Sequence, residues 1–259
     1  ACSDNKTVVI VDSFLSDKEI VQDDYGFIRL ACVAYDGEST IFKDIKAESN
    51  VQGVSCAIDS ISGYSLGIIQ VNVDKDVPID TKCTIDISAT DGNGHKASVK
   101  HSFTVVKEKL SIHVASAGES ILPEIPIPYL GKAMIVDMPT TVGQLKDNDF
   151  TAFVLNGNKT DTIIDADFQR FEFTHISADI PINEDKVVGL NPITNFTKIT
   201  TGDYENASTF KVTTYNKYAV GSDTQTTQTG LYLGECYATV NNESISAFYF
   251  ALVTGGIPI

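Results

Sequence analysis

Few residues in this sequence have a type and spacing that could do chemistry, and the clearest are short acidic stretches suited to calcium. Asp74-Lys75-Asp76, Asp91-Gly92-Asn93, Asp147-Asn148-Asp149 and Asp165-Ala166-Asp167 each bring carboxylate or amide oxygens together. Calcium takes about six to eight oxygen ligands, so two loops at one end of a domain would have to cooperate. We name Asp74, Asp76, Asp91 and Asn93 as candidate calcium ligands. Asp and Asn are also ordinary turn residues, and this simpler interpretation is favoured.

The sequence contains no His-Glu-x-x-His and no phosphate-binding glycine loop. Gly63-Tyr64-Ser65-Leu66-Gly67 matches the letters of Gly-x-Ser-x-Gly, but no helical pattern follows it, as the strand-turn-helix of a nucleophile elbow requires. The histidines lack helical ligand spacing, and we expect surface or half-buried strand positions for His95, His101, His113 and His175. No Cys-x-x-Cys pair indicates zinc. We therefore expect no cofactor and no catalysis, with a hydrolase assembled on loops of the second half as the weakest alternative.

Tyrosines are the remaining candidates for ligand binding, because the chain has ten Tyr and no Trp. Tyr204, Tyr215 and Tyr218 lie in or beside polar segments rich in Thr and Asn. An exposed group of such rings would form a platform for a glycan. The simpler interpretation, which is favoured, is that they are half-buried sheet residues with solvated hydroxyls.

The charge of the chain restricts its partners. The formal net charge is -15; residues 1–109 carry 11 Lys and Arg against 17 Asp and Glu, and residues 110–259 carry 8 against 17. Binding to a phosphate backbone depends on Lys and Arg, so a nucleic-acid partner is excluded. Docking on anionic lipid through a basic patch is disfavoured for the same reason.

The elements that must position these residues are strands. Period-two alternation recurs along the chain between turn signals, and no window holds a convincing helical stripe. Composition shifts after Glu108-Lys109, where Lys becomes sparser and Thr, Asn and aromatic residues more frequent. The sequence therefore predicts an all-β protein with a tether at 1–6, a β-sandwich at 7–108 and a second β-sandwich or jelly-roll-like domain at 109–259. No internal repeat is detected.

The segment CTIDISATDGNGHKASVKHSFTV resembles the last hairpin of bacterial immunoglobulin-like domains, and the resemblance covers about residues 7–107. It implies an immunoglobulin-like sandwich that serves as a spacer or binding module. The chain departs from antibody-type domains because it has no Trp, and Thr81 stands where their conserved Tyr would be. In antibody-type domains the second and sixth strands are bridged, so the resemblance also implies a Cys32–Cys83 disulfide. Two buried reduced thiols are the alternative.

The first residues, Ala1-Cys2-Ser3-Asp4, resemble the cleavage region of bacterial lipoproteins, in which the Cys carries the lipid. The resemblance implies lipidation of Cys2, export and anchoring at the outer membrane, with the chain in the periplasm or on the surface. The triplets Asp59-Ser60-Ile61 and Asp161-Thr162-Ile163 resemble a short O-glycosylation signal of some Gram-negative anaerobes, which makes Ser60 and Thr162 candidate acceptors.

These expectations converge on a non-catalytic surface or periplasmic lipoprotein that binds or scaffolds a glycan or protein partner and touches the membrane only through its lipid. Glycan-utilisation lipoproteins are similar in architecture. The alternative is a structural adhesin or pilus-type subunit, which an open groove missing a strand would favour. We expect function in the second domain, which holds the long irregular segments 117–131, 176–201 and 216–230.

Overall fold

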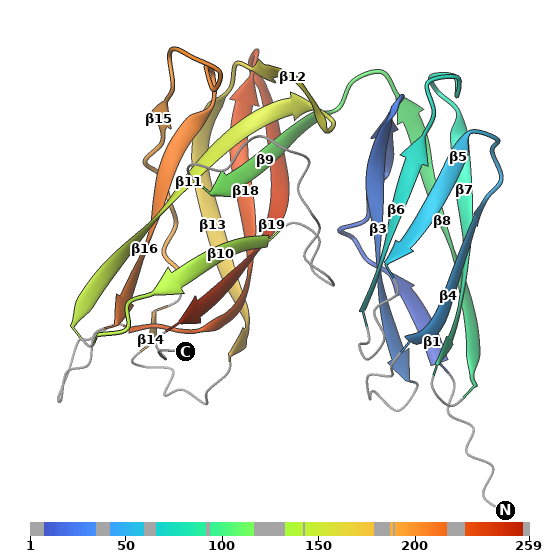
Figure 1. Cartoon of the computed structure of the whole chain (residues 1–259), viewed down its shortest axis with the longest axis horizontal. Coiled ribbons are helices and arrows are strands. Elements are labelled where there is room, and N and C mark those ends of the chain that lie inside the picture. Colours follow the sequence, from blue (N-terminus) through green and yellow to red (C-terminus); the bar gives the residue numbers. More distant parts are fainter. Residues whose placement is uncertain are drawn as a thin grey trace, which may run out of the picture. The chain divides into compact units, whose positions relative to one another are not determined.

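A computed structural model of the chain describes residues 8–34, 42–59, 66–91, 94–116, 133–141, 143–178, 187–188, 190–216 and 226–255. Every regular element among them is a strand, which confirms the predicted all-β fold. The chain divides into two compact units between Lys109 and Leu110 (Figure 1). Cys2 and Ser60 lie outside the described residues. No helix among the described residues is long and apolar enough to cross a membrane.

The first unit is a sandwich of two four-stranded sheets. One sheet has the order β1-β3-β6-β5, formed by β1 (Val8–Asp12), β3 (Asp24–Ala34), β6 (Leu66–Val73) and β5 (Val54–Asp59). The other has the order β2-β8-β7-β4, formed by β2 (Glu19–Val21), β8 (Lys96–Val106), β7 (Lys82–Asp91) and β4 (Phe42–Ser49). In chain order these are the A-B-E-D and A′-G-F-C sheets of an immunoglobulin sandwich. The topology therefore confirms the immunoglobulin-like fold of this unit.

Alternation along β7 sets the core of the first unit. Cys83, Ile85, Ile87 and Ala89 are all buried, as their parity predicts, and they pack with residues such as Ile69 and Val71 from the facing sheet. Alternation places every second side chain of each sheet in the space between the two sheets, and these side chains exclude water from the core of the sandwich.

The predicted Cys32–Cys83 disulfide is wrong for this structure, because Cys83 has a free thiol, with its Sγ 3.2 Å from Ser49 Oγ. Its near neighbour is Cys56, whose pKa is raised to about 11 by burial and by the Cys83 thiol. Cys56 pairs with Val71, which pairs in turn with Gly26. Cys32 lies six residues further along β3, roughly 20 Å at 3.3 Å per residue. A disulfide needs Cα atoms within about 7 Å, so the two cysteines lie at heights along the sandwich that are too different for a bridge.

A polar network pins the corner where the chain passes from β1 to β2. The His101 ring is only 3% exposed; its Nδ1 lies 2.6 Å from Asp12 Oδ2 and its Nε2 lies 2.6 Å from the Asp17 carbonyl oxygen. Ser16 Oγ donates to Asp12 Oδ1 over 2.6 Å and accepts from the Arg29 N–H over 2.9 Å. The expectation of a surface or half-buried His101 is therefore wrong. His113 is also buried, with Nε2 2.7 Å from the Gly157 carbonyl oxygen.

The second unit is also a sandwich of two main sheets. One has the order β10-β19-β18-β13, formed by β10 (Ala133–Met138), β19 (Glu243–Gly255), β18 (Gly230–Val240) and β13 (Asp167–Ala178). The other places β9 (Leu110–Ser116) beside β11 (Gln144–Asn156), followed by β16 (Ser208–Asn216) and β15 (Thr197–Lys198), with β12 (Lys159–Ile164) pairing the end of β11. The short strands β14 (Val187–Val188) and β17 (Thr226–Thr227) pair separately.

The two units repeat one topology. The order β9-β11-β16-β15 corresponds to β1-β3-β6-β5, and β10-β19-β18-β13 corresponds to β2-β8-β7-β4. Even the strand directions agree, because β10 runs parallel to β19 as β2 runs parallel to β8, while the other pairs of these sheets are antiparallel. The second domain is therefore an immunoglobulin-like sandwich rather than a jelly roll, and the chain is a tandem whose repeat is structural only.

Local sequence explains the long β18–β19 hairpin of the second unit. Val240 pairs with Glu243, so the loop is the dipeptide Asn241–Asn242, and both residues have positive φ, 46° and 65°. Asn tolerates this region and favours such tight hairpins. In β18, Gly234 faces the Phe171 ring so closely that an added Cβ would collide with it. Beside them Cys236 is fully buried, and burial raises the pKa of its thiol to about 12.

Candidate functional site

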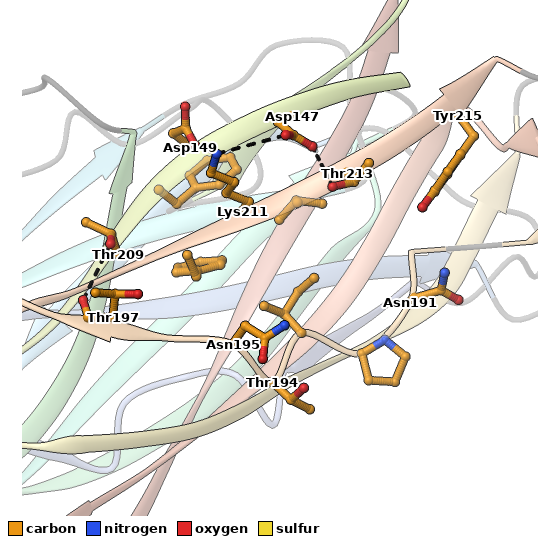
Figure 2. A pocket seen from close by; sticks show the side chains of 15 residues that line it. Asp147, Asp149, Asn191, Thr194, Asn195, Thr197, Thr209, Lys211, Thr213 and Tyr215 are labelled. Atoms are coloured by element: carbon orange, nitrogen blue, oxygen red, sulfur yellow. Dashed lines mark hydrogen bonds and ion pairs between the residues drawn. The ribbon is translucent and has the colours of Figure 1, made fainter. Parts of the chain in front are cut away.

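The second unit carries a groove of about 700 Å³ with polar lining between β16 and the segment 191–197. Figure 2 shows β16 along one side and Asn191, Thr194 and Asn195 along the other, with Tyr215 at one end and the Thr197–Thr209 pair at the opposite end. The groove therefore lies along the edge of the sheet, where the segment that leads to β15 turns away from β16.

The groove exists because segment 191–197 is shared between the two sheets. Thr197 pairs with Thr209 of β16, but Ile193 pairs with Phe171 of β13 in the other sheet, through backbone hydrogen bonds of 2.7 and 2.8 Å. Pro192, next to Ile193, has no N–H to give to a ladder. The segment therefore cannot follow β16 and diverges from it beyond Thr197.

Divergence leaves part of the β16 edge without a neighbouring strand. Residues of an antiparallel strand direct their backbone groups alternately to one side and the other. The Ala207 carbonyl accepts from Ile199, and the Tyr215 N–H donates to Thr227 Oγ1 over 2.9 Å, so odd-numbered residues face away from β11. Lys211 and Thr213 are also odd-numbered, so their N–H and C=O groups face away from β11 as well. Within the described part of the chain, no strand pairs with them on that side.

The outer rim of the groove carries two carboxylates that share one ammonium group. Lys211 Nζ lies 3.8 Å from Asp149 Oδ1 and 4.0 Å from Asp147 Oδ2, and Thr213 Oγ1 donates to Asp147 Oδ1 over 2.6 Å (Figure 2). None of the described residues that line the groove is a His or Cys. Its lining offers hydrogen-bonding groups and apolar contacts but no activated nucleophile with a partner base, so the geometry suits binding.

The three candidate tyrosines do not form one platform. Tyr215 is half-buried and lines the groove. Tyr204 packs on a separate small cluster with Phe153 and Leu155, near the opposite end of β16. Tyr215 lies eight positions after Ala207, a separation of roughly 26 Å along a strand. Tyr218 lies outside the described residues. Of the two that the structure describes, Tyr215 belongs to the site and Tyr204 does not.

The structure describes the side chains of two of the four candidate calcium ligands, Asp74 and Asp76. Asp74 and Asp76 are exposed in the turn after β6, where the Asp74 carbonyl accepts from the Val77 N–H. Asn93 and the side chain of Asp91 lie outside the described residues. Among the residues that the structure does describe, no group of three or more His, Cys, Asp or Glu is placed to hold a metal. Asp74 and Asp76 act here as turn residues.

Thr162, the second candidate O-glycosylation site, is exposed on β12. Its side chain is therefore accessible to a modifying enzyme. Glycosylation of Thr162 stays a prediction, as does that of Ser60.

Sequence reasoning missed Lys211, Thr213 and Asn195 as site residues. Lys211 and Thr213 alternate with buried Phe210 and Val212, as on any half-exposed strand, so nothing local marks them. The expectation that the long segment 176–201 carries function did point to one wall of the groove. The signal available in the sequence was Pro192 within that segment.

Comparison with known proteins assigns no family to this chain. No family model matches it, and no curated protein matches its sequence. Solved structures with similar architecture include domains 5–6 of the S-layer protein SbsC, at 12% identity and a TM-score of 0.39, covering 96% of this chain and 100% of that one. The tandem Ig repeats of Dlar match at 10% identity and a TM-score of 0.31, covering 96% and 99%. The Yersinia pseudotuberculosis adhesin InvE matches at 8% identity and a TM-score of 0.26, covering 95% and 58%. These likenesses carry no functional assignment, and the strand order of each unit remains the basis for the fold.

Proposed function

We propose that this chain is a non-catalytic module of the periplasm or cell surface, tethered by a lipid on Cys2, that binds or scaffolds a partner through the groove of its second unit. The observation that carries the proposal is the groove itself, in which an edge of β16 that pairs with no described strand lies beside a polar rim of two carboxylates and one ammonium group. A glycan or a protein segment fits such a lining. The bare edge favours the protein segment, as in an adhesin-type subunit.

The lipid tether has a direct test in the full-length precursor. The precursor should partition into a detergent phase, and Cys2→Ser should move it to the aqueous phase, because the acyl chains supply the membrane affinity. Phase separation of cell extracts, followed by immunoblotting, measures this. Equal partition of both forms would remove the tether from the proposal and leave the groove untouched.

Binding through the groove has a test with a matched control. Asp149 and Lys211 lie directly opposite each other in the β11–β16 ladder, as Asp86 and Lys100 do in the β7–β8 ladder of the first unit. Exchanging the groove pair (Asp149→Lys with Lys211→Asp) reverses the charge pattern on the rim. We expect at least a tenfold loss of binding on combined glycan and peptide arrays, since rim charges orient a ligand.

The same exchange at the control pair (Asp86→Lys with Lys100→Asp) should change binding by less than about twofold, because it alters an equally exposed pair on the other unit. Binding that survives the groove exchange, or that only the control exchange abolishes, would place the ligand elsewhere. Turnover of a bound glycan or peptide by the unmodified chain would favour the hydrolase alternative instead.

A further inference from the structure

We infer that the groove is an acceptor for an extended peptide: a segment of another protein adds as a strand to the edge of β16 at Lys211–Thr213, where no strand pairs among the described residues. The inference rests on the proposed binding role of the groove and names the ligand class. Three residues span roughly 10 Å, which is the length of a short edge strand.

The backbone of β16 provides the recognition. The N–H and C=O groups of Lys211 and Thr213 face the groove, one pair every second residue. An extended peptide presents its own donors and acceptors with the same period. It can therefore continue the hydrogen-bond ladder along β16 from the Thr197–Thr209 pair, where the pairing with β15 stops. A glycan has no such period, and for this reason the edge favours a peptide.

The two faces of the groove determine which side chains the added strand should carry. On the inner side, Ile193 is half-buried and Pro192 is exposed, and both line the groove beside the buried Phe210. Residues of the added strand that point inward therefore meet apolar surface. Residues that point outward lie beside Lys211 and Thr213, so polar side chains suit them. The peptide should alternate β-branched or apolar residues with polar ones.

Charge selects the partner. The outer rim carries two carboxylates against one ammonium group, and the whole chain has a net charge of -15. A second copy of this acidic chain would be repelled as it approached, whereas a segment with Lys or Arg at its ends would be attracted. The occupant is therefore a neutral or basic segment of a different protein.

The test uses the full chain and one synthetic probe, an eight-residue peptide in which Val and Thr alternate between a Lys at each end. Lys211→Pro and Thr213→Pro each remove one groove-facing N–H and leave the ladder with β11 intact, since proline is tolerated at a strand edge. We expect each to weaken peptide binding about tenfold or more. Lys211→Ala keeps the N–H and should weaken binding less than about threefold.

A second probe and a second measurement protect the test against a misfolded variant. The same peptide with an N-methyl group on every residue has no N–H to donate from either edge, so it should fail to bind the unmodified chain. In hydrogen exchange, the amides of Lys211 and Thr213 should be fast in the free chain and slow with peptide, while that of Val212 is slow in both. Equal binding of the N-methylated peptide, or slow exchange at Lys211 and Thr213 without peptide, would overturn the inference.

A glycan that binds, is lost in the Asp149/Lys211 exchange and in Lys211→Ala, yet persists in both proline variants would also overturn the strand inference while leaving the proposed function standing. Failure of every groove variant to affect any ligand would remove both.

Discussion

Phe171→Ala should lower the free energy of unfolding of the second unit by about 3–5 kcal/mol, the usual cost of deleting a buried aromatic ring. Phe171 is fully buried, its ring is stacked on Phe173 at 4.7 Å, and it lies 5.8 Å from the Phe210 ring. Its backbone also holds Ile193 away from β16. The cavity left by the ring therefore loosens both the core and the inner wall of the groove.

Urea unfolding of the full chain, with native-state hydrogen exchange at β11 and β18 amides to assign the transition, measures this effect. Phe248→Ala is the matched control, because Phe248 is 45% exposed on β19 and its truncation should cost at most about 1 kcal/mol. Peptide binding should weaken in Phe171→Ala and persist in the control. Equal losses of stability in the two variants would contradict the central place given to Phe171.

A double variant tests whether the Phe171 ring and Gly234 constrain each other. Gly234→Ala alone puts a methyl group against the Phe171 ring and should destabilise the unit. In the Phe171→Ala background the ring is gone, so the same change should cost little or fill part of the cavity. The two effects should therefore fail to add by about 1–3 kcal/mol. Additive effects would mean that the ring and Gly234 do not constrain each other.

The strands could be predicted from the sequence because each half-buried strand repeats its own local signal. Cys83, Ile85, Ile87 and Ala89 alternate strictly, and Asn241–Asn242 marks a hairpin, so elements and turns follow from neighbours in the chain. The repeat of one topology in both units could not be found this way. The repeat depends on which strands pair with each other. The paired strands of one unit do not resemble in sequence the corresponding strands of the other.

The candidate site was harder to predict, because long-range geometry creates it. The resemblance implied a Cys32–Cys83 disulfide but did not give the heights of the two residues along the sandwich, so the inferred disulfide was wrong. The groove depends on a single bridge between Ile193 and Phe171 and on Pro192 beside it. Lys211 and Thr213 have the ordinary sequence of an exposed strand face. Only the absence of a neighbour beside them among the described strands makes them a site, and no local pattern encodes that.

His101→Leu should lower the free energy of unfolding of the first unit by about 2–4 kcal/mol, because two acceptors lose their partner in a buried corner. The Asp17 carbonyl only accepts, so Nε2 carries a proton, and the 2.6 Å contact between Nδ1 and Asp12 Oδ2 needs another. The pair is thus an imidazolium with a carboxylate, or an imidazole with a carboxylic acid. Leucine supplies neither proton. Asp12 is 24% exposed, so water offsets part of the cost.

Lys100→Ala is the control, since Lys100 sits one residue earlier on β8 with its side chain 75% exposed, and its loss should change stability by less than about 0.5 kcal/mol. A cycle with Asp12→Ala should show a coupling of about 1–3 kcal/mol, because both changes break one contact. Zero coupling would mean that the His101–Asp12 contact contributes nothing. Since each unit has its own core, His101→Leu should leave peptide binding by the second unit unchanged. A loss of binding together with first-unit stability would show that the groove depends on the first unit.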